Sequence, residues 1–242
     1  MEEQQHIIET FSEMAPRYEG LMNSELTRFW GFTYEGFVSE ILEGLQTNQK
    51  DVILDIATGT AFIPSYLIRH SKPFKKIIGL DLTFHMLHNA GRNIPEVDKQ
   101  HRPELICASA HEMPLKPACI DRAICCLATH HMNADLLLSN IFISLKPGGI
   151  AHLADAGGSS RWKNGIIRSL IKTIAFIYFL VTENYSRAIA ESSAIANIHT
   201  AAEWAEIAKE EGFINIKIHE MKSKKFWAPN PITMKFEKPK EK

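Results

Sequence analysis

A turn of small residues follows the first strongly apolar run of the sequence and could hold a nucleoside. The turn, DIATGTA from Asp55 to Ala61, comes directly after the apolar run at residues 52–54. Small residues at every second position let the backbone turn tightly and let a ligand lie against it. Asp81 ends the next apolar run, where a carboxylate can accept two hydrogen bonds from the diol of a ribose. The spacing therefore predicts a nucleoside-type ligand between the turn and Asp81.

The motifs that are missing narrow the choice of nucleoside. The sequence contains neither G-x-G-x-x-G, which binds a dinucleotide, nor G-x-x-x-x-G-K-[ST], which cradles phosphates. The carboxylate of Asp55, just ahead of the turn, would repel a phosphate but suits an ammonium group. S-adenosylmethionine is a cationic nucleoside without phosphates, and we expect it as the cofactor.

Three residues at the ends of later apolar runs could accept a proton. His130 and His131 follow the fourth run, and a neutral imidazole near pH 7 can deprotonate an acidic carbon or a hydroxyl. Asp155 ends the fifth run and is a second candidate base. Positioning supplies most of the rate effect in methyl transfer, so these histidines could equally brace their loop. The four cysteines show no C-x-x-C pair and no histidine spacing suited to zinc, so no metal site is predicted.

The elements that position these residues alternate between strands and helices. The apolar runs are four to six residues long and nearly without polar alternation, which is typical of strands buried on both faces. The runs are Asp51–Ile56, Lys76–Leu80, Glu104–Cys107, Arg122–Leu127 and Gly149–Ala154, followed by Ile214–Ile218 and Thr233–Phe236. The helical candidates between them are Ala61–His70, Thr83–Arg92 and Ala134–Leu145. This order predicts an α/β fold with a doubly wound, mostly parallel seven-stranded sheet, whose ligands lie at the carboxyl ends of the strands.

The chain is predicted to form a single domain, 1–242, with additions around a core. We expect an N-terminal helical cap at 1–46, a cofactor-binding core at 47–156 and a helical lid insertion at 157–199. A C-terminal helix and strands at 200–236 and a frayed tail at 237–242 complete the chain. Thr200 and Glu203 form a capping-box pattern that begins the helix Ala201–Glu211.

One segment, Gly165–Val181, is the longest apolar stretch. Arg168 and Lys172 leave only Thr173–Val181 uninterrupted, which is well short of the ~20 residues of a spanning helix. The segment is therefore either a helix packed on the core, or a lid or interfacial helix beside an apolar substrate pocket.

Five short motifs occur in order along nearly the whole chain. They are FSEMAPRYEGLMN at Phe11–Asn23, LDIATGT, IIGLDLTFHML, ASAHEMPL and SLKPGG. In this order the chain resembles a class I S-adenosylmethionine-dependent methyltransferase and, within that class, the ubiquinone/menaquinone biosynthesis C-methyltransferase family. The resemblance implies the Rossmann-like methyltransferase fold and methyl transfer from S-adenosylmethionine.

The resemblance also implies which residues hold the cofactor. The first turn would contact the methionine part, the second motif the ribose and adenine, and the third motif the edge of the adenine. The residues concerned are Asp55, Ala57 and Gly59, then Asp81 and Leu82, then Ser109 and Ala110, with Thr58 and Met86 beside them. Leu127 would lie beneath the sulfonium, and Tyr18 would close over the cofactor from the N-terminal helices.

Three positions depart from the family pattern. Ala61 replaces a third glycine, at little cost as long as its φ is negative. Ser109 replaces an aspartate that accepts a hydrogen bond from the adenine amino group. This replacement weakens cofactor binding by on the order of 1 kcal/mol. His199-Thr200 replaces a Phe-Pro pair of the quinone-methylating enzymes, so methyl transfer is expected more firmly than specificity for a quinone.

Composition bounds the partners and the compartment. The residues are 45% hydrophobic and 23% charged, and the net charge of −1 gives no electrostatic reason to expect nucleic acid. The N-terminus is acidic and polar where a signal peptide would be basic and apolar, which favours a cytoplasmic protein. A transmembrane segment is not expected, although peripheral membrane contact is compatible with the apolar segment. The oligomeric state is left open.

These observations lead to one function and one alternative. The first is S-adenosylmethionine-dependent methyl transfer to a carbon or oxygen of a hydrophobic or aromatic small molecule, suggested by the aromatic residues at 157–199. In the alternative, the protein binds S-adenosylmethionine but does not transfer its methyl group. The protein would then catalyse a cyclisation or rearrangement, or act as a non-catalytic binding protein.

Overall fold

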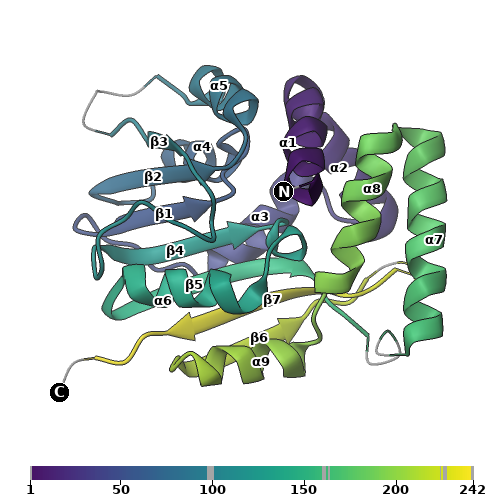
Figure 1. Cartoon of the computed structure of the whole chain (residues 1–242). Helices are drawn as coiled ribbons and strands as arrows, with labels where there is room; N and C mark the ends of the chain where they lie inside the picture. Colours follow the sequence, from purple (N-terminus) through teal and green to yellow (C-terminus); the bar gives the residue numbers. More distant parts are fainter. Residues whose placement is uncertain are drawn as a thin grey trace.

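A seven-stranded sheet of order β3-β2-β1-β4-β5-β7-β6 runs through the centre of the protein (Figure 1). The computed structural model describes residues 2–96, 101–159, 162, 164–223, 225 and 228–240. The strands are β1 (Val52–Ile56), β2 (Lys76–Asp81), β3 (Glu104–Cys107), β4 (Ile120–Cys126), β5 (Leu145–Ala156), β6 (Ile214–Glu220) and β7 (Pro231–Glu237). Strands β1 to β5 pair in parallel, and β7 is antiparallel to both β5 and β6. The predicted fold class is confirmed.

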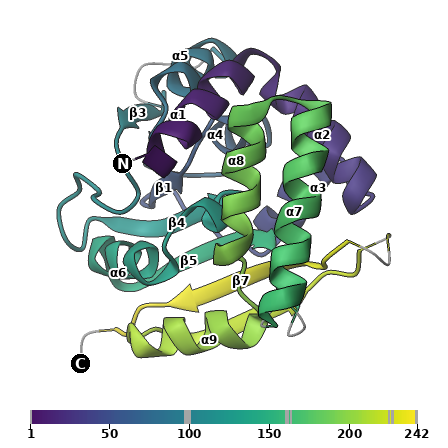
Figure 2. The same cartoon turned by 45° about the vertical axis from the view of Figure 1, so that its right-hand side comes forward.

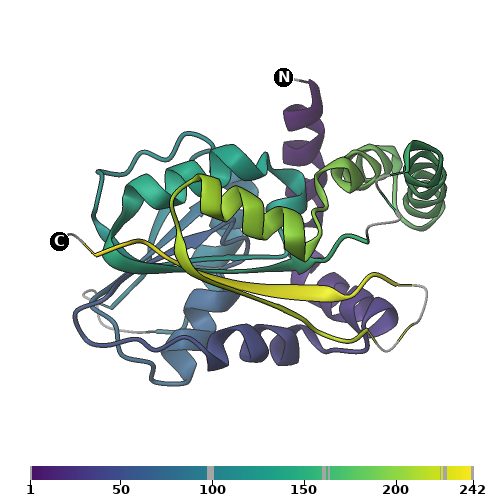
Figure 3. The same cartoon turned by 90° about the horizontal axis from the view of Figure 1, so that it is seen from below.

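The central strands are mostly apolar, without regular polar alternation, because both faces of the sheet are covered. Successive residues of β1 point to opposite faces, so Leu54 packs in one hydrophobic cluster and Ile53 in another. Helices α6 (Ala134–Ser144) and α9 (Ala201–Glu210) cover the face of Leu54, and α3 (Tyr34–Glu43) and α4 (Phe62–Arg69) cover the opposite face (Figure 3). Helix α5 (Phe84–Asn93) follows β2. The absence of polar alternation in the sequence is the direct consequence of this double coverage.

A second group of helices stands at the carboxyl ends of the parallel strands. It contains α1 (Glu2–Met14), η1 (Ala15–Arg17), α2 (Tyr18–Phe29), α7 (Gly165–Thr182), α8 (Tyr185–Ala194) and η4 (Ile195–Asn197). Helix α8 packs between α1 and α7, so the N-terminal helix meets the segment that follows β5 beside the carboxyl ends of the strands (Figures 1 and 2). A short helix after β4, η2 (Thr129–His131), faces this group.

Some element boundaries differ from those predicted. Strand β5 begins at Leu145 and includes the Lys146–Gly149 turn, because the chain pairs with Ile120 before a register shift restores regular pairing. The predicted tail begins inside β7, which extends to Glu237, and residues 241 and 242 lie outside the described residues. The capping box of Thr200 and Glu203 is confirmed.

The exposure of helix α7 argues against one interpretation of the apolar segment, and the lid or interfacial helix stays a prediction. None of its residues is buried, so the interpretation as a helix packed on the core is wrong. It is the one described helix that is long and apolar enough to cross a membrane by length and composition.

Candidate cofactor site and methyl-transfer site

A cavity of about 640 Å³ opens at the carboxyl ends of β1, β2 and β4 and is roofed by the N-terminal helices. Ten residues named from the sequence line it: Tyr18, Ala57, Gly59, Asp81, Leu82, Met86, Ser109, Ala110, Leu127 and His131. Four others do not: Asp55, Thr58, His130 and Asp155. The parallel strands bring the predicted motifs together because their carboxyl ends lie on one edge of the sheet.

Asp81 ties the turn after β1 to the end of β2. One carboxylate oxygen, Oδ2, accepts a hydrogen bond from the backbone N–H of Gly59 at 2.8 Å, and Oδ1 accepts from the N–H of Thr83 at 2.8 Å. The side chain is buried, and burial raises its pKa. Each oxygen keeps a lone pair toward the cavity, so the carboxylate can still accept from a ribose diol.

Asp55 lies behind the turn and does not line the cavity. Its Oδ2 accepts from the hydroxyl of Thr58 at 2.6 Å, and the side chain is 1% exposed. Burial raises the pKa of Asp55 to about 7. Thr58 and Asp55 therefore hold the shape of the turn from beneath, and the charge of Asp55 acts on a ligand through the turn.

The turn contains three left-handed residues at alternate positions. The φ angles are 54° at Ala57, 54° at Gly59 and 61° at Ala61. The condition for a small cost at Ala61, a negative φ, is not met, because Ala61 precedes α4 in the left-handed region, where an L-residue with a Cβ costs roughly 1–2 kcal/mol. Leu127, at the end of β4, has a φ of 55°. Left-handed non-glycine residues thus occur on two sides of the cavity.

Tyr18 reaches the turn from above. A Cβ at Gly59 would lie 3.8 Å from Cε1 of Tyr18, so the tyrosine ring packs over this glycine. The next residue, Glu19, accepts a hydrogen bond from the hydroxyl of Thr60 at 2.9 Å. These contacts fix the start of α2 against the turn.

Beyond Leu127, the loop with the two histidines closes the end of the cavity. Asp155 accepts hydrogen bonds from the hydroxyl of Thr129 at 2.6 Å and from the N–H of Ala156 at 2.7 Å, and its Oδ1 lies 2.7 Å from Nδ1 of His130. Burial opposes a charge on His130, but the adjacent Asp155 carboxylate outweighs it and raises the pKa of His130 to about 9. Asp155 thus acts on the site from behind η2, through Thr129 and His130, and does not line the cavity.

His131 is the histidine that faces the cavity. Its ring lies edge-on to Phe11 with 5.3 Å between centroids, and 4.2 Å from the ring of His130. Burial, together with the charge of His130, lowers the pKa of His131 to about 4. The neighbouring histidines therefore differ in charge near pH 7, with a neutral imidazole at the cavity wall.

Several lining residues were not named from the sequence as site residues. They are Gln4, Ile7, Thr83, His111, Glu112, Met132, Asn133, Leu136 and Asn197. His111 accepts at Nε2 from the N–H of Asn133 at 3.0 Å, and burial lowers its pKa. Ser109 accepts from the N–H of His111 at 3.2 Å, so its hydroxyl also shapes this loop. The residues of α1 and η4 carry no local signal, because only the packing of remote helices brings them to the cavity.

Comparisons with known proteins agree with this fold and cavity. Residues 54–153 match the family model described as a methyltransferase domain. The chain is 27% identical over 233 residues to the mitochondrial 2-methoxy-6-polyprenyl-1,4-benzoquinol methylase of Caenorhabditis elegans, covering 89% of this chain and 75% of that protein. It is 24% identical over 217 residues to the demethylmenaquinone methyltransferase of Lactobacillus johnsonii, covering 86% and 84%.

A solved structure shows the same fold at lower identity. Phosphoethanolamine N-methyltransferase 2 of Haemonchus contortus superposes with a TM-score of 0.66 and 16% identity, covering 95% of this chain and 60% of that chain. The fold is the Rossmann-like methyltransferase fold. Residues 54–153 match a methyltransferase domain, and the chain is similar over most of its length to S-adenosylmethionine-dependent methyltransferases.

Proposed function

We propose that the protein transfers the methyl group of S-adenosylmethionine to a carbon or oxygen of a hydrophobic small molecule with an aromatic, phenol-like ring. The observation that carries this proposal is the wall of the cavity beyond Leu127. The lining includes the apolar side chains of Ile7, Phe11, Met132 and Leu136, and the polar groups beside them come from His131, Gln4, Asn133 and Asn197. A partly apolar lining with a few polar groups suits a flat ring that bears a hydroxyl.

The cofactor occupies the other half of the cavity in this proposal. Asp81 accepts from the ribose, Leu82 and Met86 flank the adenine, and the turn with Gly59 lies against the methionine part. The methyl donor is a sulfonium and already activated, so the protein has to align the acceptor atom and exclude water. Tyr18, packed over Gly59, covers the cofactor from the solvent side.

The acceptor must lose a proton if it reacts through a hydroxyl or an activated ring carbon. His131 is the imidazole at the cavity wall, and His130 with Asp155 holds its loop in place. The relatives whose names specify benzoquinol and demethylmenaquinone act on this chemical class of ring. Their names support the choice of class, whereas the specific acceptor of this chain is for experiment to identify.

Helix α7 supports delivery of such an acceptor from a membrane surface. Exposed apolar residues recur every three or four positions along it, at Ile166, Leu170, Ile174, Ile177 and Val181. The opposite side is held by the protein, since Tyr178 accepts a hydrogen bond from Arg28 at 2.7 Å and Arg187 lies over the ring of Phe179. A helix with one anchored and one apolar side lies in the plane of an interface.

The test is incubation of the purified protein with methyl-labelled S-adenosylmethionine and a panel of short-chain prenyl quinols, phenols and amines. Label in an organic-soluble quinol or phenol product supports the proposal. Binding of the cofactor with a changed but unlabelled acceptor supports the cyclisation or rearrangement alternative. Label only in the amines overturns the proposed acceptor class.

A further inference from the structure

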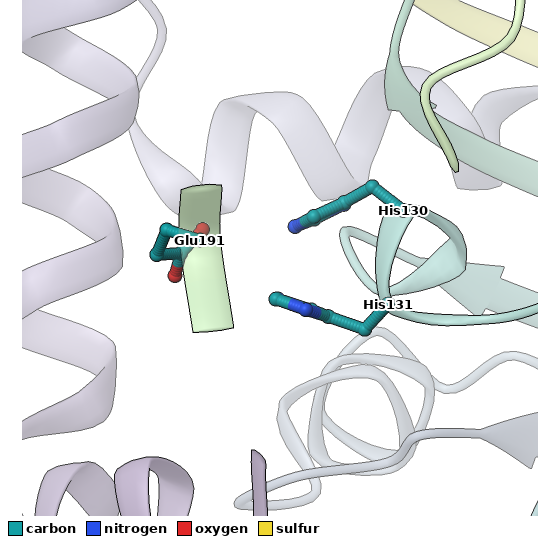
Figure 4. A group of neighbouring side chains, drawn as sticks. All are labelled: His130, His131 and Glu191. Atoms are coloured by element: carbon teal, nitrogen blue, oxygen red, sulfur yellow. The ribbon is translucent and has the colours of Figure 1, made fainter. Parts of the chain in front are cut away.

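Two histidines and a glutamate meet at the acceptor end of the cavity. His130 and His131 come from η2 and Glu191 from α8, and one potential ligand atom of each lies within 4.8 Å of the other two. Figure 4 shows both imidazole rings directed toward the Glu191 side chain. The packing of α8 against η2 brings these residues together across some sixty positions of sequence.

His130 is oriented as a metal ligand would be. Its Nδ1 lies 2.7 Å from the Asp155 carboxylate, which leaves Nε2 as the nitrogen that can bind an ion once the ring has given up its second proton. A carboxylate on the second ring nitrogen is the usual partner of a metal-binding histidine, because it fixes the tautomer and the direction of the ring. Asp155 is itself held by Thr129 and Ala156, so the orientation of His130 is built into the end of β5.

The charges around Glu191 also favour a cation. Glu25, Glu183 and Glu191 all lie within 4 Å of one guanidinium, that of Arg187, which is 1% exposed. The Nε and Nη1 atoms of Arg187 form no hydrogen bond among the described residues, and the contact of Nε with Glu191 is 3.5 Å long. Glu191 is therefore only loosely held by its cation and has an oxygen to offer to a metal ion.

We propose that His130, His131 and Glu191 bind one divalent transition-metal ion of the zinc class at the acceptor end of the cavity. Two imidazoles and a carboxylate match the ligand set of catalytic zinc, with an open position for a substrate oxygen. Ligand bonds of about 2.0–2.1 Å place tetrahedral donors about 3.4 Å apart, so small side-chain rotations complete the site. The sequence analysis predicted no metal site, because the third ligand lies on a distant helix.

The ion would act on the acceptor, and in this respect the inference rests on the proposed function. His131 is both a wall residue of the cavity and a ligand, so the open position faces the acceptor ring. A bound metal lowers the pKa of a coordinated hydroxyl and fixes its oxygen in place. A phenol-like acceptor would thus be held through its oxygen, and its hydroxyl proton would pass to solvent water, so that no protein base is required.

The test is calorimetric titration of Zn²⁺ into protein that has been stripped with a chelator and dialysed. We expect about one ion per chain. His131→Asn and Glu191→Gln should each weaken binding by more than the roughly 10–100-fold that loss of an outer partner costs. His219→Gln, at an exposed position of β6, is the matched control and should bind as the wild type does. Circular dichroism melting identifies any variant that does not fold. If one of the two variants fails to fold, the absorption spectrum of Co²⁺ bound to the variant that does fold provides a second measurement of metal binding.

Absence of zinc binding at micromolar concentrations, or unchanged binding in both folded variants, overturns the inference. Titration of S-adenosylmethionine into the same metal-free protein separates this result from the proposed function. If the cofactor binds and the metal does not, the metal site is wrong and the methyltransferase site stands.

Discussion

At the scale of single residues, Asp81 and the turn after β1 determine how the cofactor is held. Both oxygens of Asp81 are engaged by backbone N–H groups of Gly59 and Thr83, so this carboxylate shapes the turn as well as facing the ligand. The sequence predicted the residue from its spacing alone. It could not predict that Asp55 would turn away toward Thr58, because that choice depends on the left-handed backbone at Ala57.

Asp81→Ala should weaken S-adenosylmethionine binding by at least about 100-fold, because two charge-assisted hydrogen bonds to the ribose are lost at about 1.5–3 kcal/mol each. Asp81→Asn keeps one acceptor oxygen, so its affinity for S-adenosylmethionine should lie between those of the wild type and Asp81→Ala. Calorimetric titration measures both, with thermal melting to show that the variants are folded. Wild-type affinity in a folded Asp81→Ala protein would overturn the site map.

Ala61→Gly should stabilise the protein by about 0.5–1 kcal/mol. Glycine removes the cost of a Cβ at a φ of 61°, and this gain exceeds the extra backbone entropy of the unfolded chain. Ala205→Gly, in the middle of α9, is the matched control and should destabilise by about 1 kcal/mol. Urea unfolding measures both changes, and a loss of stability in Ala61→Gly would contradict the strain assigned to the turn.

Binding of S-adenosylmethionine should release protons near pH 6.5. Burial raises the pKa of Asp55 to about 7, so below that pH the carboxyl group of the free protein is mostly protonated. A bound cation favours the ionised form, so affinity should rise with pH and level off above about pH 7. Titrations in buffers of different ionisation heat measure the protons. Asp55→Asn should remove the protons that Asp55 releases on binding. If the number of protons released is unchanged in that variant, they come from other groups.

At the scale of elements, the helices above the sheet add what the strands cannot supply. Helix α1 places Ile7 and Phe11 over the cavity, and α8 brings Glu191 to the two histidines. Arg187 of α8 donates to Glu25 of α2 at 2.8 Å, which ties this helix to the N-terminal cap. Helix α7 is held only along one side, and its exposed apolar residues form the surface assigned to a membrane.

Ile174→Glu should weaken binding to phospholipid vesicles by about tenfold or more, because burial of one isoleucine contributes roughly 2 kcal/mol. Ile174 is 59% exposed, and Ile143 of α6, at 49%, offers a matched control on another helix. Ile143→Glu should bind vesicles as the wild type does. Vesicle co-sedimentation measures the effect. Equal losses in both variants, or a dimer that only Ile174→Glu dissociates, would contradict a lipid surface on α7.

At the scale of the whole molecule, the sequence predicted the sheet better than its surroundings. Runs such as Val52–Ile56 are buried on both faces, so their missing alternation identified the central strands. The cavity residues at strand ends followed from the topology, which brings residues such as Gly59 and Asp81 to one edge. Residues of α1, η4 and α8 could not be predicted, because their position depends on tertiary packing and not on any local pattern.

We expect one cavity to hold S-adenosylmethionine with its methyl group directed at an apolar acceptor pocket. A crystal structure with S-adenosylhomocysteine would show where each part of the cofactor lies. We predict the ribose hydroxyls on Asp81, the adenine between Leu82 and Met86, and the sulfur facing Leu127 and His131, with empty apolar space beyond it. A nucleoside bound elsewhere, or a sulfur pointing away from His131, would contradict the account.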